Sequence, residues 1–108
     1  MATVVTTYWV NPLTDSYILP EAPGEVLNAA IAYWEDELME WRAKRPRQEA
    51  VKQEKQRRVT AAAERLERFR RARDQYGRDF RKLDKLTLEL ATGDLRPVMK
   101  RATAERAA

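Results

Sequence analysis

Between Val59 and Leu90 a mainly apolar residue recurs every three or four positions, although nearly half of the segment is charged. Such spacing places the recurring residues on one stripe of an α-helix. Three and four alternate without a slip over more than four heptads, which is the pattern by which helices pack on other helices. The stripe consists of Val59, Ala62, Leu66, Phe69, Arg73, Tyr76, Phe80, Leu83, Thr87 and Leu90.

The stripe predicts one long helix from about Arg47 to Ala91. Its heptad pattern passes through Gly77 unchanged, so we expect Gly77 to weaken the helix locally without ending it. Thr92-Gly93-Asp94 is expected to end the helix, with Gly93 in a left-handed cap. At 1.5 Å per residue the helix would be about 65–70 Å long.

A shorter helix is predicted from about Glu25, and Pro46 separates it from the long one. Its apolar residues also share one face. The residues expected to pack against the long helix within the chain are Leu27, Ile31, Trp34, Leu38 and Trp41. If the two helices are antiparallel and the chain turns at Arg45–Pro46, Leu27 lies near Glu64.

The shorter helix would then end before it could cover the far half of the stripe. A long exposed apolar stripe is rare on a monomeric protein. We therefore predict that another chain covers it. The predicted interface consists of Leu66, Phe69, Tyr76, Phe80, Leu83 and Leu90, and Leu86 would be left uncovered beside them.

The segment before the helices is rich in β-branched and aromatic residues. Thr3–Val10 predicts a strand, and Tyr17–Leu19 a short returning strand after a segment of turn-forming residues. The predicted fold is therefore mainly α: an N-terminal β-hairpin or extended arm, then a helix and a long heptad-patterned helix in a coiled-coil-like α-hairpin. The expected parts are a docking arm at 1–24, the helical hairpin at 25–91 and a basic C-terminal tail at 92–108.

Charge is divided unevenly along the chain. Residues 1–41 hold seven acids and no Lys or Arg, whereas residues 42–108 hold all 21 bases and the other ten acids. The first part therefore carries −7 and the second +11, in agreement with the net charge of +4. A chain with such opposed halves can pair with itself, within one molecule or between copies.

Residues 42–58 form the most basic segment, with eight bases and two acids. The favoured interpretation is an exposed helix face that also pairs with the acidic first helix. An acidic protein partner and nucleic acid remain open, although no aromatic residue within the segment could stack on bases. The candidates for phosphate or acidic-partner contacts are Arg45, Arg47, Lys52, Lys55, Arg57 and Arg58.

The chain has no Cys and no His, and Ser16 is its only Ser. These absences exclude disulfides, thiolate nucleophiles and imidazole catalysis. The acids at 35, 36, 37 and 40 lack a His and a glycine-shaped calcium loop, so no metal site is expected there. We expect no catalytic, cofactor-binding or metal-binding residue and no enzymatic activity. No membrane span and no signal peptide are predicted, which favours a chain made in the cytoplasm.

In general character the chain resembles the small, helix-rich accessory proteins of tailed-phage particles, which carry extended arms and coiled segments. With the uncovered stripe, this resemblance implies a non-catalytic structural or assembly protein, present in several copies of a larger complex such as a virion or its connector. Its partners would be copies of itself or other subunits. Two alternatives remain: a small regulatory protein that binds cellular machinery, and a weak, non-specific nucleic-acid-binding protein.

Overall fold

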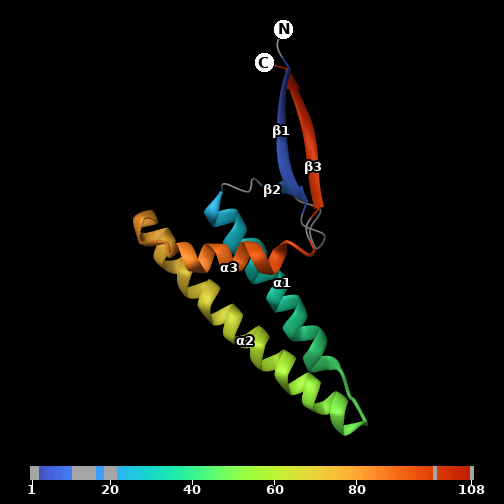
Figure 1. Ribbon diagram of the computed structural model, residues 1–108. Helices are drawn as coiled ribbons and strands as arrows, with labels where there is room; N and C mark the ends of the chain where they lie inside the picture. The colour runs from blue at the N-terminus through green and yellow to red at the C-terminus, as the bar shows by residue number, and fades with distance from the viewer. Residues whose placement is uncertain (1–2, 11–16, 19–21, 99, 108) are drawn as a thin grey trace.

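The computed structural model describes residues 3–10, 17–18, 22–98 and 100–107 (Figure 1). The helices are α1 (Pro23–Ala43), α2 (Glu49–Arg78) and α3 (Lys85–Leu95), with a 3-10 turn, η1 (Phe80–Lys82), between the last two. The strands β1 (Thr3–Val10), β2 (Tyr17–Ile18) and β3 (Lys100–Ala107) form one sheet in the order β2-β1-β3. The prediction of a mainly α protein is confirmed.

Helices α1 and α2 run antiparallel, but their register differs from the prediction. Residues 44–48 join them without forming helix, and Lys44 and Gln48 have extended backbone. Extended backbone covers about 3.3 Å per residue, about twice the 1.5 Å of a helix, so such a connection can reach past the end of α1. Helix α2 therefore begins well beyond the end of α1. As a result the first turn of α1 lies against the last turns of α2, where a Cβ on Gly24 would be 3.3 Å from Tyr76 Cε1.

This register corrects the prediction that α1 ends before the far half of the stripe. Leu66 and Phe69 were predicted to face another chain, but α1 covers them and Phe69 is 0% exposed. The core lies at the end of the helix pair away from the connecting loop. Its members are Val26, Leu27, Ala29, Ala30, Ile31, Leu66, Phe69, Ala72, Ala91 and Leu95.

The predicted single helix to Ala91 is also wrong, because α2 ends at Arg78. Asp79 has extended backbone, and its side chain accepts a hydrogen bond from the Arg81 backbone N–H at 3.1 Å. Asp84 does the same for the Leu86 N–H at 3.0 Å and caps α3. Such local bonds offer the backbone an alternative to the continued helix. The chain therefore turns after α2, and α3 packs back across the other two helices (Figure 1).

The expected left-handed cap at Gly93 is absent, because α3 continues through Gly93 to Leu95 and Gly93 has no positive φ. Pro97 follows two residues after the last helical residue, as is common beyond a helix end. The buried face of α3 consists of Thr87, Ala91 and Leu95, each four residues from the next. Of these three residues only Thr87 belongs to the predicted stripe, so α3 buries a face that the stripe did not fully identify.

Strands β1 and β3 pair antiparallel over their whole length, from Thr3 opposite Ala107 to Val10 opposite Lys100. Strand β2 pairs only with Trp9 and Val10. The predicted C-terminal tail thus includes a strand that the sequence did not predict. Residues 1–2, 11–16 and 19–21 of the predicted arm lie outside the described residues. The β1–β3 ribbon projects away from the helices (Figure 1).

The molecule is elongated, with extents of 63 × 29 × 17 Å. Its long direction combines the helix pair and the projecting ribbon (Figure 1). Among the described residues, no helix combines the length and the apolar character needed to cross a bilayer.

Candidate interaction surfaces

The three helices meet at the carboxylate of Asp94 in α3. Its Oδ2 atom accepts a hydrogen bond from Trp34 Nε1 of α1 at 3.2 Å and pairs with Arg65 Nε of α2 at 3.3 Å. The Asp94 side chain is only 16% exposed. Burial, followed by the Glu37 and Asp94 carboxylates, raises the pKa of the neighbouring Tyr33. This junction holds the fold together and offers little surface to a ligand.

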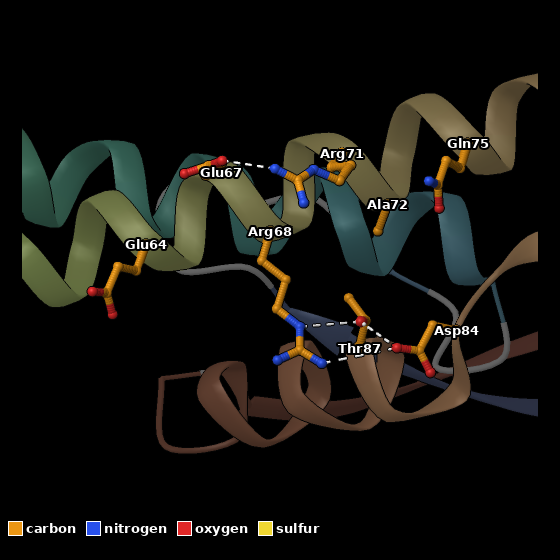
Figure 2. Close-up of a pocket in the computed structure, with 8 residues that line it drawn as sticks. All are labelled: Glu64, Glu67, Arg68, Arg71, Ala72, Gln75, Asp84 and Thr87. Carbon is orange, nitrogen blue, oxygen red and sulfur yellow. Dashed lines mark hydrogen bonds and ion pairs between the residues drawn. The ribbon is translucent and has the colours of Figure 1, made fainter.

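A groove of about 440 Å³ runs between α2 and α3 (Figure 2). Arg68 Nε donates to the Thr87 hydroxyl at 3.1 Å, and that hydroxyl donates to Asp84 Oδ2 at 3.0 Å. Arg71 pairs with Glu67 at 2.7 Å on α2 itself. These groups satisfy one another, so the groove functions as a polar contact between helices.

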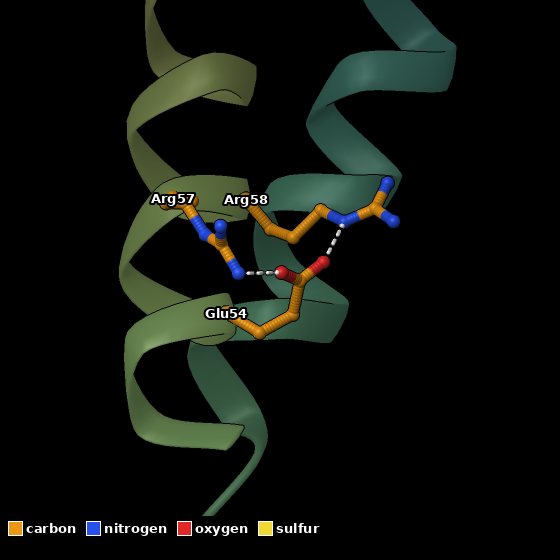
Figure 3. A network of polar contacts seen from close by, with 3 residues as sticks. All are labelled: Glu54, Arg57 and Arg58. Carbon is orange, nitrogen blue, oxygen red and sulfur yellow. Dashed lines mark hydrogen bonds and ion pairs between the residues drawn. The ribbon is translucent and has the colours of Figure 1, made fainter. Parts of the chain in front are cut away.

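The predicted basic segment is largely engaged within the chain. Glu54 pairs with Arg57 at 2.6 Å and with Arg58 at 2.8 Å (Figure 3). The hydrogen bond from Arg58 lowers the pKa of Glu54, and Glu54 raises the pKa of Arg58. The Arg58 guanidinium also lies 5.6 Å from the Trp41 ring centre. Two predicted contact residues therefore serve α2 itself and its packing on α1.

Two more bases of this segment close the end of α1. Lys55 Nζ donates to the Lys44 carbonyl at 2.8 Å, and Arg45 donates to the Arg42 carbonyl at 2.9 Å. Cations at a helix C-terminus satisfy free carbonyls and complement the helix dipole. Arg47 and Lys52 are exposed. Of the six predicted contacts, Arg45, Lys55, Arg57 and Arg58 thus have partners within the helix pair or its connection.

The residues predicted to pack within the chain lie along α1 as expected from their spacing. Leu27 and Ile31 are buried, Trp34 and Leu38 pack against the core, and Trp41 is half-buried. The Lys44 ammonium lies 3.7 Å from the Trp41 ring centre. The end of the helix pair near the loop is therefore held by cation–π contacts rather than by a buried core.

The turn between α2 and α3, residues 78–86, presents two large apolar side chains and is called the tip below. Phe80 is 71% exposed and Leu86 is 68% exposed. Of the other residues predicted for an interface, Tyr76, Leu83 and Leu90 are partly buried against the core. The exposed bases of the tip are Arg78, Arg81, Lys82 and Lys85.

The acids of the tip are bound locally. Arg81 Nε donates to Asp79 at 3.1 Å, and the side-chain and backbone hydrogen bonds from Arg81 lower the pKa of Asp79. Asp84 accepts from the Leu86 N–H and the Thr87 hydroxyl. The tip therefore carries more positive than negative charge toward solvent.

The exposed apolar residue Met39 was not among the interaction residues predicted from the sequence. Met39 is 72% exposed and lies on α1 between the exposed acids Asp36 and Glu40. Met39 follows Asp36 by three residues, so the two are neighbours on the helix surface, and that spacing was the available signal.

No family model matches the chain, and neither a curated protein nor a solved structure matches it. Within the described residues, no group of acids is arranged to hold a metal ion.

Proposed function

We propose that this protein is a non-catalytic structural or assembly subunit that works in several copies within a larger complex, of the kind found in a tailed-phage virion or its connector. The exposure of Phe80 and Leu86 carries the proposal. Both are more than two-thirds exposed, although the core of the three helices is complete without them. Burying a side chain of this kind against a partner stabilises a complex by about 1.5–3 kcal/mol.

The ribbon of β1 and β3 supports the same function. Within the described part of the chain, Thr3–Tyr8 has a paired strand on one side only. A two-stranded ribbon is barely stable in water by itself, and an open strand edge can pair with another chain. The ribbon is therefore suited to a docking arm that extends from the helical body by β-augmentation.

Replacing Phe80 with Asp tests the proposal. The variant should keep its helices, because Phe80 is exposed, but its self-association should weaken at least about tenfold through the lost burial. On the same sample, circular dichroism measures the helix content and sedimentation equilibrium measures the self-association. Val51→Asp is the matched control, since Val51 is 41% exposed at the other end of α2. A parent chain that stays monomeric at high micromolar concentration, or a Phe80→Asp variant that assembles like the parent, would contradict the proposal.

A further inference from the structure

We infer that the tip of one copy docks on an acidic face of α1 in a second copy. This acidic face consists of Asp36, Met39 and Glu40. The inference rests on the proposed multi-copy function and identifies the two surfaces that meet.

The acidic face combines negative charge with an exposed apolar side chain. Asp36 and Glu40 are four residues apart on α1, so they are neighbours on one side of the helix, and Met39 lies beside them. All three are exposed. Methionine is unbranched and adapts its shape to irregular contacts. Glu35 is not part of this face, because its carboxylate already pairs with Arg70 of α2 at 2.8 Å.

The tip offers the complementary arrangement. Phe80 and Leu86 are its apolar contacts, and the exposed Lys82 and Lys85 lie in sequence between them. Each surface therefore has an apolar centre, and the two have opposite charge. Opposite potentials across an interface steer the partners together and select the orientation in which they meet.

The two surfaces are too far apart to meet within one molecule. Gly24 lies against Tyr76, close to the tip, whereas Met39 is fifteen residues further along the same helix. That separation is about 22 Å along the helix axis. The contact therefore requires a second copy. Because it joins two different faces, it can repeat from copy to copy in a ring or a chain, as a multi-copy subunit requires.

Charge reversal on each surface tests the contact. One variant carries Lys82→Glu and Lys85→Glu, and the other carries Asp36→Lys and Glu40→Lys. Each variant alone should self-associate at least tenfold more weakly than the parent, because like charges then face each other. An equal mixture of the two should associate again, since an acidic tip meets a basic face and a basic tip meets an acidic face. Sedimentation velocity at low salt follows all three samples, and circular dichroism verifies their folding.

Arg47→Glu with Lys52→Glu is the matched control, because these exposed bases lie in the loop before α2 and in its first turn, at the end away from the tip. It should associate like the parent. Failure of the mixture to associate would overturn the inference. Weakened assembly in Phe80→Asp with normal assembly in both charge-reversed variants would also overturn it, and would leave the proposed function standing. The parent and the tip variant are also mixed with vesicles of anionic phospholipid. If the parent binds them and the tip variant does not, while the tip variant keeps the parent's mass, the tip is a membrane contact instead. A monomeric parent would contradict both the proposed function and this contact.

Discussion

At the scale of single residues, Asp94 links all three helices. One of its oxygens contacts both Trp34 of α1 and Arg65 of α2, so a single atom of α3 bonds to both other helices. The sequence placed Trp34 on the apolar face of α1. It did not indicate Asp94, because a Thr-Gly-Asp segment is typical of a helix end and α3 continues through it. Contacts of this kind between distant segments leave no periodic signal.

Replacing Asp94 with Ala should lower the free energy of unfolding by about 1–3 kcal/mol, because the Trp34 N–H and the Arg65 guanidinium lose a largely buried acceptor. Asp94→Asn should cost less, since the amide oxygen still accepts a hydrogen bond while the charge is lost. Urea unfolding followed by circular dichroism measures both. The exposed Asp74→Ala should stay within about 0.5 kcal/mol of the parent. If Asp94→Ala matched that control, Asp94 would not hold the helices together.

At the scale of elements, the apolar pattern identified the buried faces of α1 and α2 but not where α2 ends. Tyr76 before Asp79 and Phe80 and Leu83 after it keep the three- and four-residue spacing of the stripe. A break that preserves this spacing cannot be detected from the periodicity. The available signal was the pair of aspartates, Asp79 and Asp84, which cap η1 and α3. Their local hydrogen bonds compete with the helix, and this competition is invisible to an apolar count.

The sequence also did not indicate how far the connection between α1 and α2 reaches. A tight turn at Arg45–Pro46 would place Leu27 near Glu64, whereas the non-helical residues 44–48 shift α2 by about two and a half turns. That shift brings Phe69 under α1 and moves the core away from the loop. Of the predicted interface, only the side chains past the end of α1 therefore remain available to a partner. Phe80 is the most exposed of them.

Helix α2 should gain stability from Gly77→Ala. Gly77 is helical, and a Cβ there would have no atom within 4 Å. Alanine restricts the unfolded chain more than glycine, so the free energy of unfolding should rise by up to about 1 kcal/mol. Gly24→Ala is the comparison, because the ring of Tyr76 crowds that position and should reduce the gain. Thermal unfolding measures the two. A loss of stability in Gly77→Ala would mean that this turn of α2 is not helical in solution.

At the scale of the whole molecule, the ribbon joins the two ends of the chain, and the sequence predicted only one of its long strands. Thr3–Val10 is rich in residues that favour strands, whereas Lys100–Ala107 contains mostly residues that favour helices. Only the pairing with β1 makes β3 a strand, and such a long-range contact is not encoded in local composition. The charge division along the chain was visible in the sequence, but Met39 within the acidic face was not identified.

The ribbon and the helices should unfold as separate units, because the core residues that the structure describes all come from α1, α2 and α3. Thr103→Pro together with Ala104→Pro tests this separation. Adjacent residues of a strand direct their backbone groups to opposite sides, so one of the two substitutions must remove an N–H that faces β1. Hydrogen exchange should show lost protection in β1 and β3, while the helical amides and the urea midpoint of the helices stay unchanged. Thr60→Pro, in the middle of α2, is the contrasting variant and should abolish the helical fold at a cost of about 3 kcal/mol or more. If the ribbon variant also lowered the urea midpoint of the helices, the two ends of the chain would belong to the folding unit itself, and the ribbon could not serve as an independent docking arm.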